Sequence, residues 1–313
     1  MASIRRRAGI ALTTTGLVVA TALGSAGQEL TWTGTIQYAQ GRYIFTETTR
    51  SWTLYSGLTW QGERLRLSLG IPVVAQDSRA VTYVGELPLP TGGPDHSAVA
   101  QRTKGEPVPM GRRGGSGGGG PSAMGVGVQP PVAAQTSGSP VDSVSAPGSV
   151  SVELADPVVS TGFQLLRSRG AFLGLDLTGA VKLPMRDLES GVGTGEFDAG
   201  LGVSTAFGGG GTLLFADLSW WRYGDLPDLP LDDVLSYGVG VGRTLGGRWS
   251  GLLTLSGSTG VIDNVDPPAE LGALVSVAAG GKYGITLGAG VGLTESSPDV
   301  SLSLGGRIRL HGR

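Results

Sequence analysis

The sequence predicts an all-β protein, an antiparallel transmembrane β-barrel of about twelve strands with long external loops. Apolar and polar residues alternate along many segments of about ten residues, the length of a tilted membrane-spanning strand. Glycine makes up 56 of the 313 residues and charged residues only 15%. Typical soluble domains have about 7% glycine and about 25% charged residues. Short turns and longer connections also alternate along the chain, as they do in outer-membrane barrels.

The segment 300–310 shows the alternation most clearly. Every second residue from Val300 onward is apolar or glycine, and the opposite face carries serines, a glycine, Arg307 and Arg309. A period of two is the side-chain repeat of a β-strand. A membrane barrel turns its apolar face to lipid and its polar face to the lumen, so we expect both arginines inside the barrel.

Further segments repeat this pattern and bring the expected strand count to about twelve, an even number as in bacterial barrels. These segments are 30–38, 52–60, 65–71, 159–165, 173–183, 197–207, 214–220, 237–241, 249–255, 271–277 and 283–293.

The connections between these segments predict the topology. The tight links are 61–63, 167–170, 208–211, 246–247 and 280–281. The longer links are 41–50, 73–157, 184–195, 223–233, 261–269 and 294–299. Outer-membrane barrels keep short turns in the periplasm and long loops outside. We therefore expect both ends of the barrel chain to lie on the periplasmic side.

Aromatic residues on the apolar faces fall near both ends of the predicted strands. Rings with a polar edge are favoured at membrane–water interfaces, so we expect two aromatic girdles there. The alternative is that they are ordinary surface or core aromatics of a soluble barrel. The expected girdle residues are Trp32, Trp52, Trp60, Phe197, Phe207, Trp220, Tyr237, Trp249 and Tyr283.

Charged residues on the polar faces are expected to face the lumen. They are Arg64, Arg66, Asp176, Lys182, Asp198, Asp217, Arg307 and Arg309. Structural ion pairing is the usual role of such groups. A hydrolase using a pair of these aspartates is the alternative.

The N-terminus predicts a secretory signal peptide over residues 1–26. Arg5, Arg6 and Arg7 are basic, residues 8–23 are apolar apart from threonines, and residues 24–26 have the small residues of a cleavage site. A retained helical anchor is the alternative. The mature chain, 27–313, is therefore expected to be exported and to reach the cell outer membrane.

The link 73–157 contains an unusually long low-complexity segment. Residues 114–120 are glycines and one serine, and Pro130-Pro131 and Gly138-Ser139-Pro140 follow. Such composition buries too little apolar surface to offset ordering entropy, which favours a mostly disordered external loop. The alternatives are a constriction that folds into the lumen and an adhesive surface.

Composition argues against most chemistry. The chain has no cysteine, and its two histidines, His96 and His311, fall in the long link and the C-terminal tail. We expect no catalytic residue, no metal site and no cofactor. A net charge of −2 gives no basic footprint for nucleic acid. Acidic residues such as Asp266 and Glu270 are read as solvated loop positions rather than a calcium site.

Two motifs give the chain a resemblance to a known family. Val181-Lys182-Leu183-Pro184 is followed by the segment 193–202, GTGEFDAGLG, and residues 294–299 repeat its acidic character. With these motifs, the chain resembles the outer-membrane barrels named for the meta-pathway of phenol degradation, from about 30 to 310 outside the long link. The motifs are structural and imply no site residue. The resemblance implies passage of small, apolar or aromatic molecules. Such barrels commonly end on an aromatic residue, whereas this chain ends at Arg313.

Together these features predict an outer-membrane channel or transporter for passive passage of small solutes. The expected partners are outer-membrane lipid, lipopolysaccharide, the barrel-assembly machinery and a small-molecule solute; the sequence leaves the oligomeric state open. A non-conducting structural or surface-display barrel is the second hypothesis, and a soluble secreted β-barrel is the third.

Overall fold

The structure is a computed structural model that describes residues 28–45, 47–84, 87–93, 96, 99, 150–167, 171–185, 192–226 and 229–312. The expected signal peptide and residues 101–149 of the long link lie outside the described residues. Within the described part of the chain, no helix is long and apolar enough to cross a membrane.

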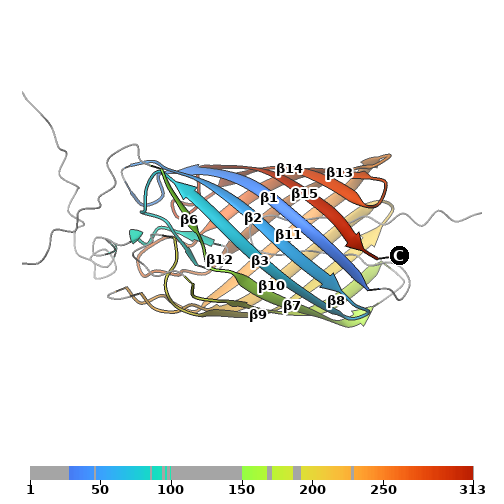
Figure 1. Ribbon diagram of the computed structural model, residues 1–313, viewed down its shortest axis with the longest axis horizontal. Helices are drawn as coiled ribbons and strands as arrows, with labels where there is room; N and C mark the ends of the chain where they lie inside the picture. Colours follow the sequence, from blue (N-terminus) through green and yellow to red (C-terminus); the bar gives the residue numbers. More distant parts are fainter. Residues whose placement is uncertain are drawn as a thin grey trace, which may run out of the picture.

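Twelve antiparallel strands form a closed barrel, which confirms the predicted fold class (Figure 1). The barrel closes because β1 pairs with β15 on one side and with β2 on the other. The remaining strands follow chain order through β14. The barrel strands are β1 (Glu29–Gly41), β2 (Thr49–Gln61), β3 (Leu65–Gln76), β7 (Val158–Arg167), β8 (Phe172–Lys182), β9 (Asp198–Gly209), β10 (Thr212–Arg222), β11 (Val234–Gly246), β12 (Trp249–Ser258), β13 (Ala269–Ala279), β14 (Tyr283–Gly292) and β15 (Val300–His311).

The two ends of the barrel differ. The short turns, the start of β1 and the end of β15 share one end, which we call the turn end. Gly210-Gly211, Gly246-Gly247 and Gly280-Gly281 all have positive φ there, a conformation that glycine adopts without steric cost. The longer connections share the opposite end, the loop end. The alternation of short and long links is therefore as the sequence predicted.

The two faces of the wall differ as the alternation predicted. Large apolar side chains point outward along every strand of the barrel; Leu201 is 61% exposed, Ile285 53% and Leu304 50%. Serines, threonines, glycines and charged groups fill most of the intervening positions, which face inward. A continuous apolar surface of this extent is far larger than a soluble monomer exposes. The outer face is therefore that of a membrane-embedded barrel.

The predicted link 73–157 has wrong bounds, because the wall extends into it. Strand β3 continues to Gln76, and a short strand, β6 (Ser151–Leu154), pairs with that extension. The neighbouring wall breaks between β6 and β7, opposite Pro72, which has no N–H to donate. The carbonyl oxygen of Pro72 instead accepts a hydrogen bond from the Ala155 backbone at 2.9 Å. Strand β3 thus continues past Pro72, and it pairs with β7 on one side of this residue and with β6 on the other.

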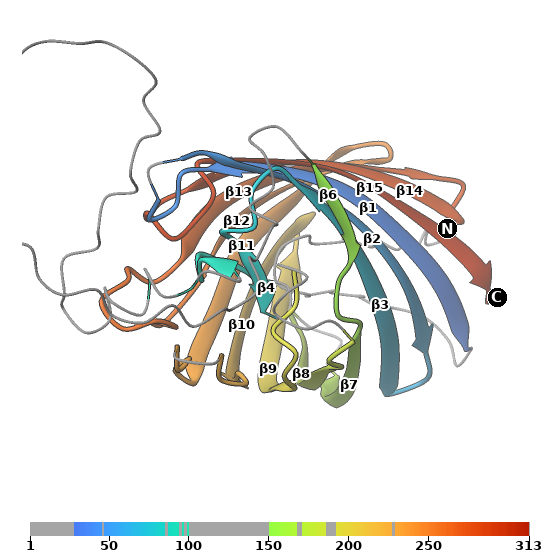
Figure 2. The same ribbon diagram turned by 60° about the vertical axis from the view of Figure 1, so that its left-hand side comes forward.

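A small hairpin from the long link lies in the loop end of the barrel (Figure 2). Its strands are β4 (Thr82–Val84) and β5 (Leu87–Leu89). The Tyr83 hydroxyl lies 3.2 Å from the hydroxyl oxygens of Ser51 and Thr53, both on the inner face of β2. For this segment the disordered-loop prediction is wrong, because the hairpin is ordered and contacts the inner face of β2. The two prolines, Pro88 and Pro90, do not prevent a hairpin of three-residue strands.

The hairpin takes part in an apolar core at the loop end. Buried side chains from three connections and the start of β11 pack together there, with the partly buried Ile44, Phe45 and Trp221 against them. The long link supplies Leu89 and Val99, and the other buried members are Tyr223, Leu226, Leu229, Leu231, Val234, Val261, Ile262 and Val265. These contacts hold the long connections together as one packed layer.

Candidate functional site in the barrel lumen

The lumen is the candidate site, and glycines shape its wall. Phe215, Asp217 and Trp221 point inward from β10, and each lies over a glycine of a neighbouring strand. Phe215 covers Gly240 of β11 so closely that a β-carbon there would clash with its ring. Inward glycines therefore let large side chains of β10 lie along the wall rather than cross the lumen.

An apolar cluster lies on this part of the inner wall. Ala206, Phe215, Leu252 and Leu274 are buried against one another, and Leu213 packs against them. They come from β9, β10, β12 and β13, and all five occupy inward positions. This lumen apolar cluster was not predicted. The signal for it was present in β10, where Leu213 and Phe215 stand at positions that alternation assigns to polar residues.

The predicted lumen charges fall into separate groups. Arg66 of β3 and Asp176 of β8 face inward and interact electrostatically. Nearer the turn end, Arg309 Nε lies 3.0 Å from Glu29 Oε1, and Arg307 faces inward on the same strand. Arg64 lies in the turn before β3 and is exposed.

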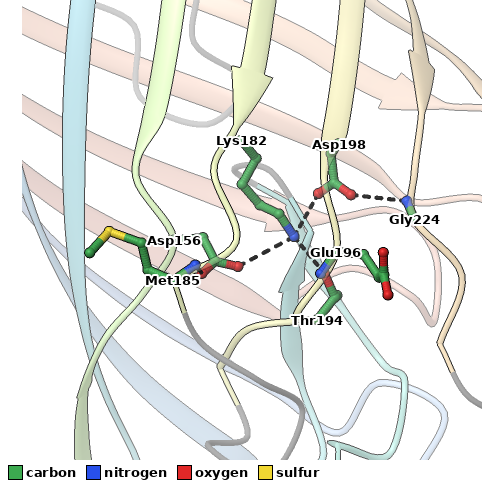
Figure 3. Close-up of polar contacts among 7 residues, drawn as sticks. All are labelled: Asp156, Lys182, Met185, Thr194, Glu196, Asp198 and Gly224. Atoms are coloured by element: carbon green, nitrogen blue, oxygen red, sulfur yellow. Dashed lines mark hydrogen bonds and ion pairs between the residues drawn. The ribbon is translucent and has the colours of Figure 1, made fainter.

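Lys182 and Asp198 form a buried polar cluster at the loop end (Figure 3). Lys182 Nζ lies 2.9 Å from Asp198 Oδ2 and 3.4 Å from Asp156 Oδ2. It also donates a 2.6 Å hydrogen bond to Thr194 Oγ1. The Lys182 and Asp198 side chains are fully buried and that of Asp156 is 2% exposed. These charges are thus enclosed in the wall and loops, not spread along an open channel.

Backbone groups complete this Lys182 cluster. Asp198 Oδ1 accepts a hydrogen bond from the Gly224 N–H at 3.1 Å, and Asp156 Oδ1 accepts one from the Met185 N–H at 2.8 Å. The cluster therefore ties the connection after β8 and the connection after β10 to the wall. Asp156 was not predicted, because it lies in the link expected to be a loop. No feature of the sequence placed it beside Lys182.

Two tyrosines at the loop end, Tyr43 and Tyr223, are buried, and a third, Tyr83, is half-buried. Burial raises the pKa of Tyr43, Tyr83 and Tyr223 above the ordinary value. For Tyr223 the nearby Asp198 carboxylate adds to the rise in pKa, since a second negative charge disfavours the phenolate. Each phenol thus stays protonated and available as a hydrogen-bond donor.

The predicted girdle residues all lie on the outward face. Phe197 is 63% exposed and Trp52 54%, both near the loop end, with Trp220 and Tyr237 at the same end. Trp249, Tyr283 and Phe207 are exposed near the turn end. Trp32 and Trp60 are half-buried there, at positions adjacent to outward Leu58 and Leu30.

The histidines and the three lumen aspartates are the residues from which a catalytic or metal site could be built. His96 Nδ1 lies 3.3 Å from the Gly93 carbonyl oxygen beside the hairpin, and His311 is exposed at the end of β15. In the part of the chain that the structure describes, no group of three His, Cys, Asp or Glu side chains is placed to hold a metal ion. Asp176, Asp198 and Asp217 stand on three successive strands, with Asp198 paired to Lys182.

Known proteins give a structural match but no sequence match. No family model matches the chain, and no curated protein does. An outer membrane channel from Pseudomonas putida F1 superimposes with a TM-score of 0.57 at 11% identity, covering 92% of this chain and 97% of that one. KdgM porin gives a TM-score of 0.45 at 4% identity, over 89% and 99% of the two chains. The CymD monoaromatic hydrocarbon channel gives 0.40 at 9% identity, over 93% and 90%. The first similarity shows the fold of an outer-membrane barrel.

Proposed function

We propose that the protein is an outer-membrane channel through which small solutes, apolar and aromatic ones among them, pass passively. The observation that carries the proposal is the lumen apolar cluster of Ala206, Leu213, Phe215, Leu252 and Leu274. Leucine and phenylalanine on an inner wall whose other positions are mostly glycines, hydroxyls and charges favour an apolar solute. The fold is shared with a solved outer membrane channel, which supports the same reading.

Polar substitution of the cluster tests this function. Replacing Leu252 and Leu274 by glutamine keeps their approximate length while it puts polar groups into the apolar cluster. We expect slower influx of N-phenyl-1-naphthylamine, an uncharged aromatic dye that fluoresces once it passes the outer membrane. The rate is measured in Gram-negative cells that lack their own general porins and produce the chain.

Ser250→Ala provides a matched control, because Ser250 also faces inward on β12 but lies outside the apolar cluster. Its influx should equal that of the wild type. Heat-modifiable gel mobility shows that each variant forms a barrel. Equal influx in cells with and without the wild-type chain would overturn the proposal.

The proposed location and biogenesis follow from the same reading. Residues 1–26 would direct export, the assembly machinery would insert the barrel, and the outward aromatics would lie at the two interfaces of a membrane containing lipopolysaccharide. Deleting residues 101–149 distinguishes a channel from a surface-display protein. A channel keeps its dye influx after the deletion, whereas a display protein loses its function with the segment.

A further inference from the structure

The lumen carries two carboxylates that no described cation neutralises. Asp198 and Asp156 contact Lys182, Glu29 contacts Arg309, and Asp176 interacts with Arg66. Asp217 and Glu270 have no ion-pair partner in the described ranges. Glu270 accepts a 2.9 Å hydrogen bond from the Ser301 hydroxyl, which does not cancel its charge.

Strand register places both carboxylates in one row of paired residues on the inner wall. Asp217 of β10 pairs with Gly238 of β11, Gly238 with Ser256 of β12, and Ser256 with Glu270 of β13. All four positions face inward. Glu270, expected in an external loop, is thus part of the lumen wall. Only a glycine and a serine separate the two acids along this row, so no bulky wall residue lies between them.

Both carboxylates lie along the wall rather than across the lumen. A β-carbon at Gly238 would clash with Asp217 Oδ1, and one at Gly290 would clash with Glu270 Oε1. Both side chains are half-buried, in contrast to the fully enclosed Lys182 cluster. Their remaining surface faces the space that a passing solute occupies.

The carboxylate row borders the lumen apolar cluster. Phe215 lies two residues from Asp217 on the same face of β10, on the side of the turn end. Leu213 and Leu252 lie in the inward-facing row that follows the row of Phe215 toward the turn end, and Leu274 pairs with Leu252 in that row. An apolar cluster and an uncompensated negative charge are therefore adjacent on one wall.

We infer that the lumen prefers small solutes that combine an apolar body with a protonated amine, and that Asp217 and Glu270 determine this preference. The inference rests on the proposed function and specifies its solute class. The apolar body contacts the cluster while the ammonium group passes the carboxylates, which compensate its lost hydration. A carboxylate-bearing solute of the same shape meets repulsion at this row, since like charges in a narrow space of low dielectric repel strongly.

A single organic salt tests the inference. Phenethylammonium phenylacetate supplies a cation and an anion that share a phenyl ring and differ in the charged group. The refolded full chain, in a planar bilayer at neutral pH, separates a concentrated from a dilute solution of this salt. We expect a reversal potential that corresponds to an ammonium-over-carboxylate permeability ratio of about tenfold, as charge-lined clefts produce.

Asp217→Asn with Glu270→Gln removes both charges and preserves side-chain size. The permeability ratio should fall to near one in this double variant. Glu63→Gln is the control, because Glu63 is exposed in a turn outside the lumen, and it should leave the ratio unchanged.

The outcomes separate this inference from the proposed function. A wild-type ratio near one, or an unchanged ratio in the double variant, overturns the inference. So does a membrane that carries no current in this salt. In each of these cases dye influx in cells stands as an independent test of the channel. Loss of dye influx with the wild-type chain would instead overturn the proposed function.

Discussion

Lys182 Nζ and Asp198 Oδ2 lie 2.9 Å apart, and both side chains are fully buried at the loop end. The two residues are directly paired across β8 and β9, although a connection of fifteen residues, 183–197, separates them in sequence. Asp156 and Thr194 complete the surroundings of the ammonium group. Burying a cation with two carboxylates costs desolvation free energy. Removing one of the partners costs more, because each remaining buried charge then lacks compensation.

Lys182→Met should therefore destabilise the protein by about 3–5 kcal/mol, the usual cost of leaving buried charges without a partner. The measurement is the free energy of unfolding in lipid vesicles, obtained from tryptophan fluorescence in urea. Lys282→Met is the matched control: Lys282 is exposed at a turn, and its loss should cost about 0.5 kcal/mol or less. Equal effects of the two substitutions would contradict the role assigned to the buried pair.

Arg66→Glu should shift the ion selectivity of the channel toward cations, whereas Arg64→Glu should have little effect. Arg66 faces inward on β3 and interacts with Asp176, whereas Arg64 is exposed in the preceding turn. A charge inside a pore acts on ions more strongly than one in bulk water. Reversal potentials across a potassium chloride gradient measure the difference. If the two variants shift the potential equally, Arg66 does not line the conducting path.

The buried tyrosines predict an alkaline limit to loop-end packing. Burial raises the folded-state pKa of Tyr43, Tyr83 and Tyr223 above the unfolded value of about 10. Above that pH the unfolded chain releases these protons while the folded one keeps them. The stability contributed by the buried phenols is thus complete below about pH 10 and is lost as pH rises further.

Phenolate absorbance in the ultraviolet tests this directly. At about pH 11, the folded protein should show about two to three fewer ionised tyrosines than the same protein in denaturant. Changing all three tyrosines to phenylalanine should remove the difference. Identical titration curves for folded and denatured chains would mean that these phenols are not protected.

The twelve barrel strands could be predicted because each has one apolar face, and a period of two marks such a strand without knowledge of its partners. Positions such as Arg307 and Leu304 followed from parity alone. The grouping of the short turns at one end of the barrel and of the long loops at the other also followed from the sequence, because short and long links alternate along the chain. These are local properties, because each strand or link shows its own pattern in the sequence independently of the segments that it contacts.

Other features depend on contacts between distant segments. Tyr83 meets Ser51 and Thr53 only because the hairpin enters the loop end, and a segment rich in glycine and proline gives little sign of that. Asp156 reaches Lys182 from within the break between β6 and β7. The lumen apolar cluster was not predicted because Leu213 and Phe215 do not fit the alternation of apolar and polar residues in β10. Leu214 and Leu218 define the outward apolar face of that strand, which leaves Leu213 and Phe215 on the face expected to be polar.

The most direct test of the account is obstruction of the lumen by one side chain. Gly305 faces inward between Thr35 and Thr286, and a β-carbon there meets only ordinary contacts, so Gly305→Trp should fit the wall and project into the channel. Gly306→Trp adds the same ring to the outward face, where a β-carbon is equally free. With both variants folded, we predict that influx of N-phenyl-1-naphthylamine falls to the level of cells without the channel for Gly305→Trp and stays at the wild-type level for Gly306→Trp. Equal influx through the two variants would contradict passage through the lumen.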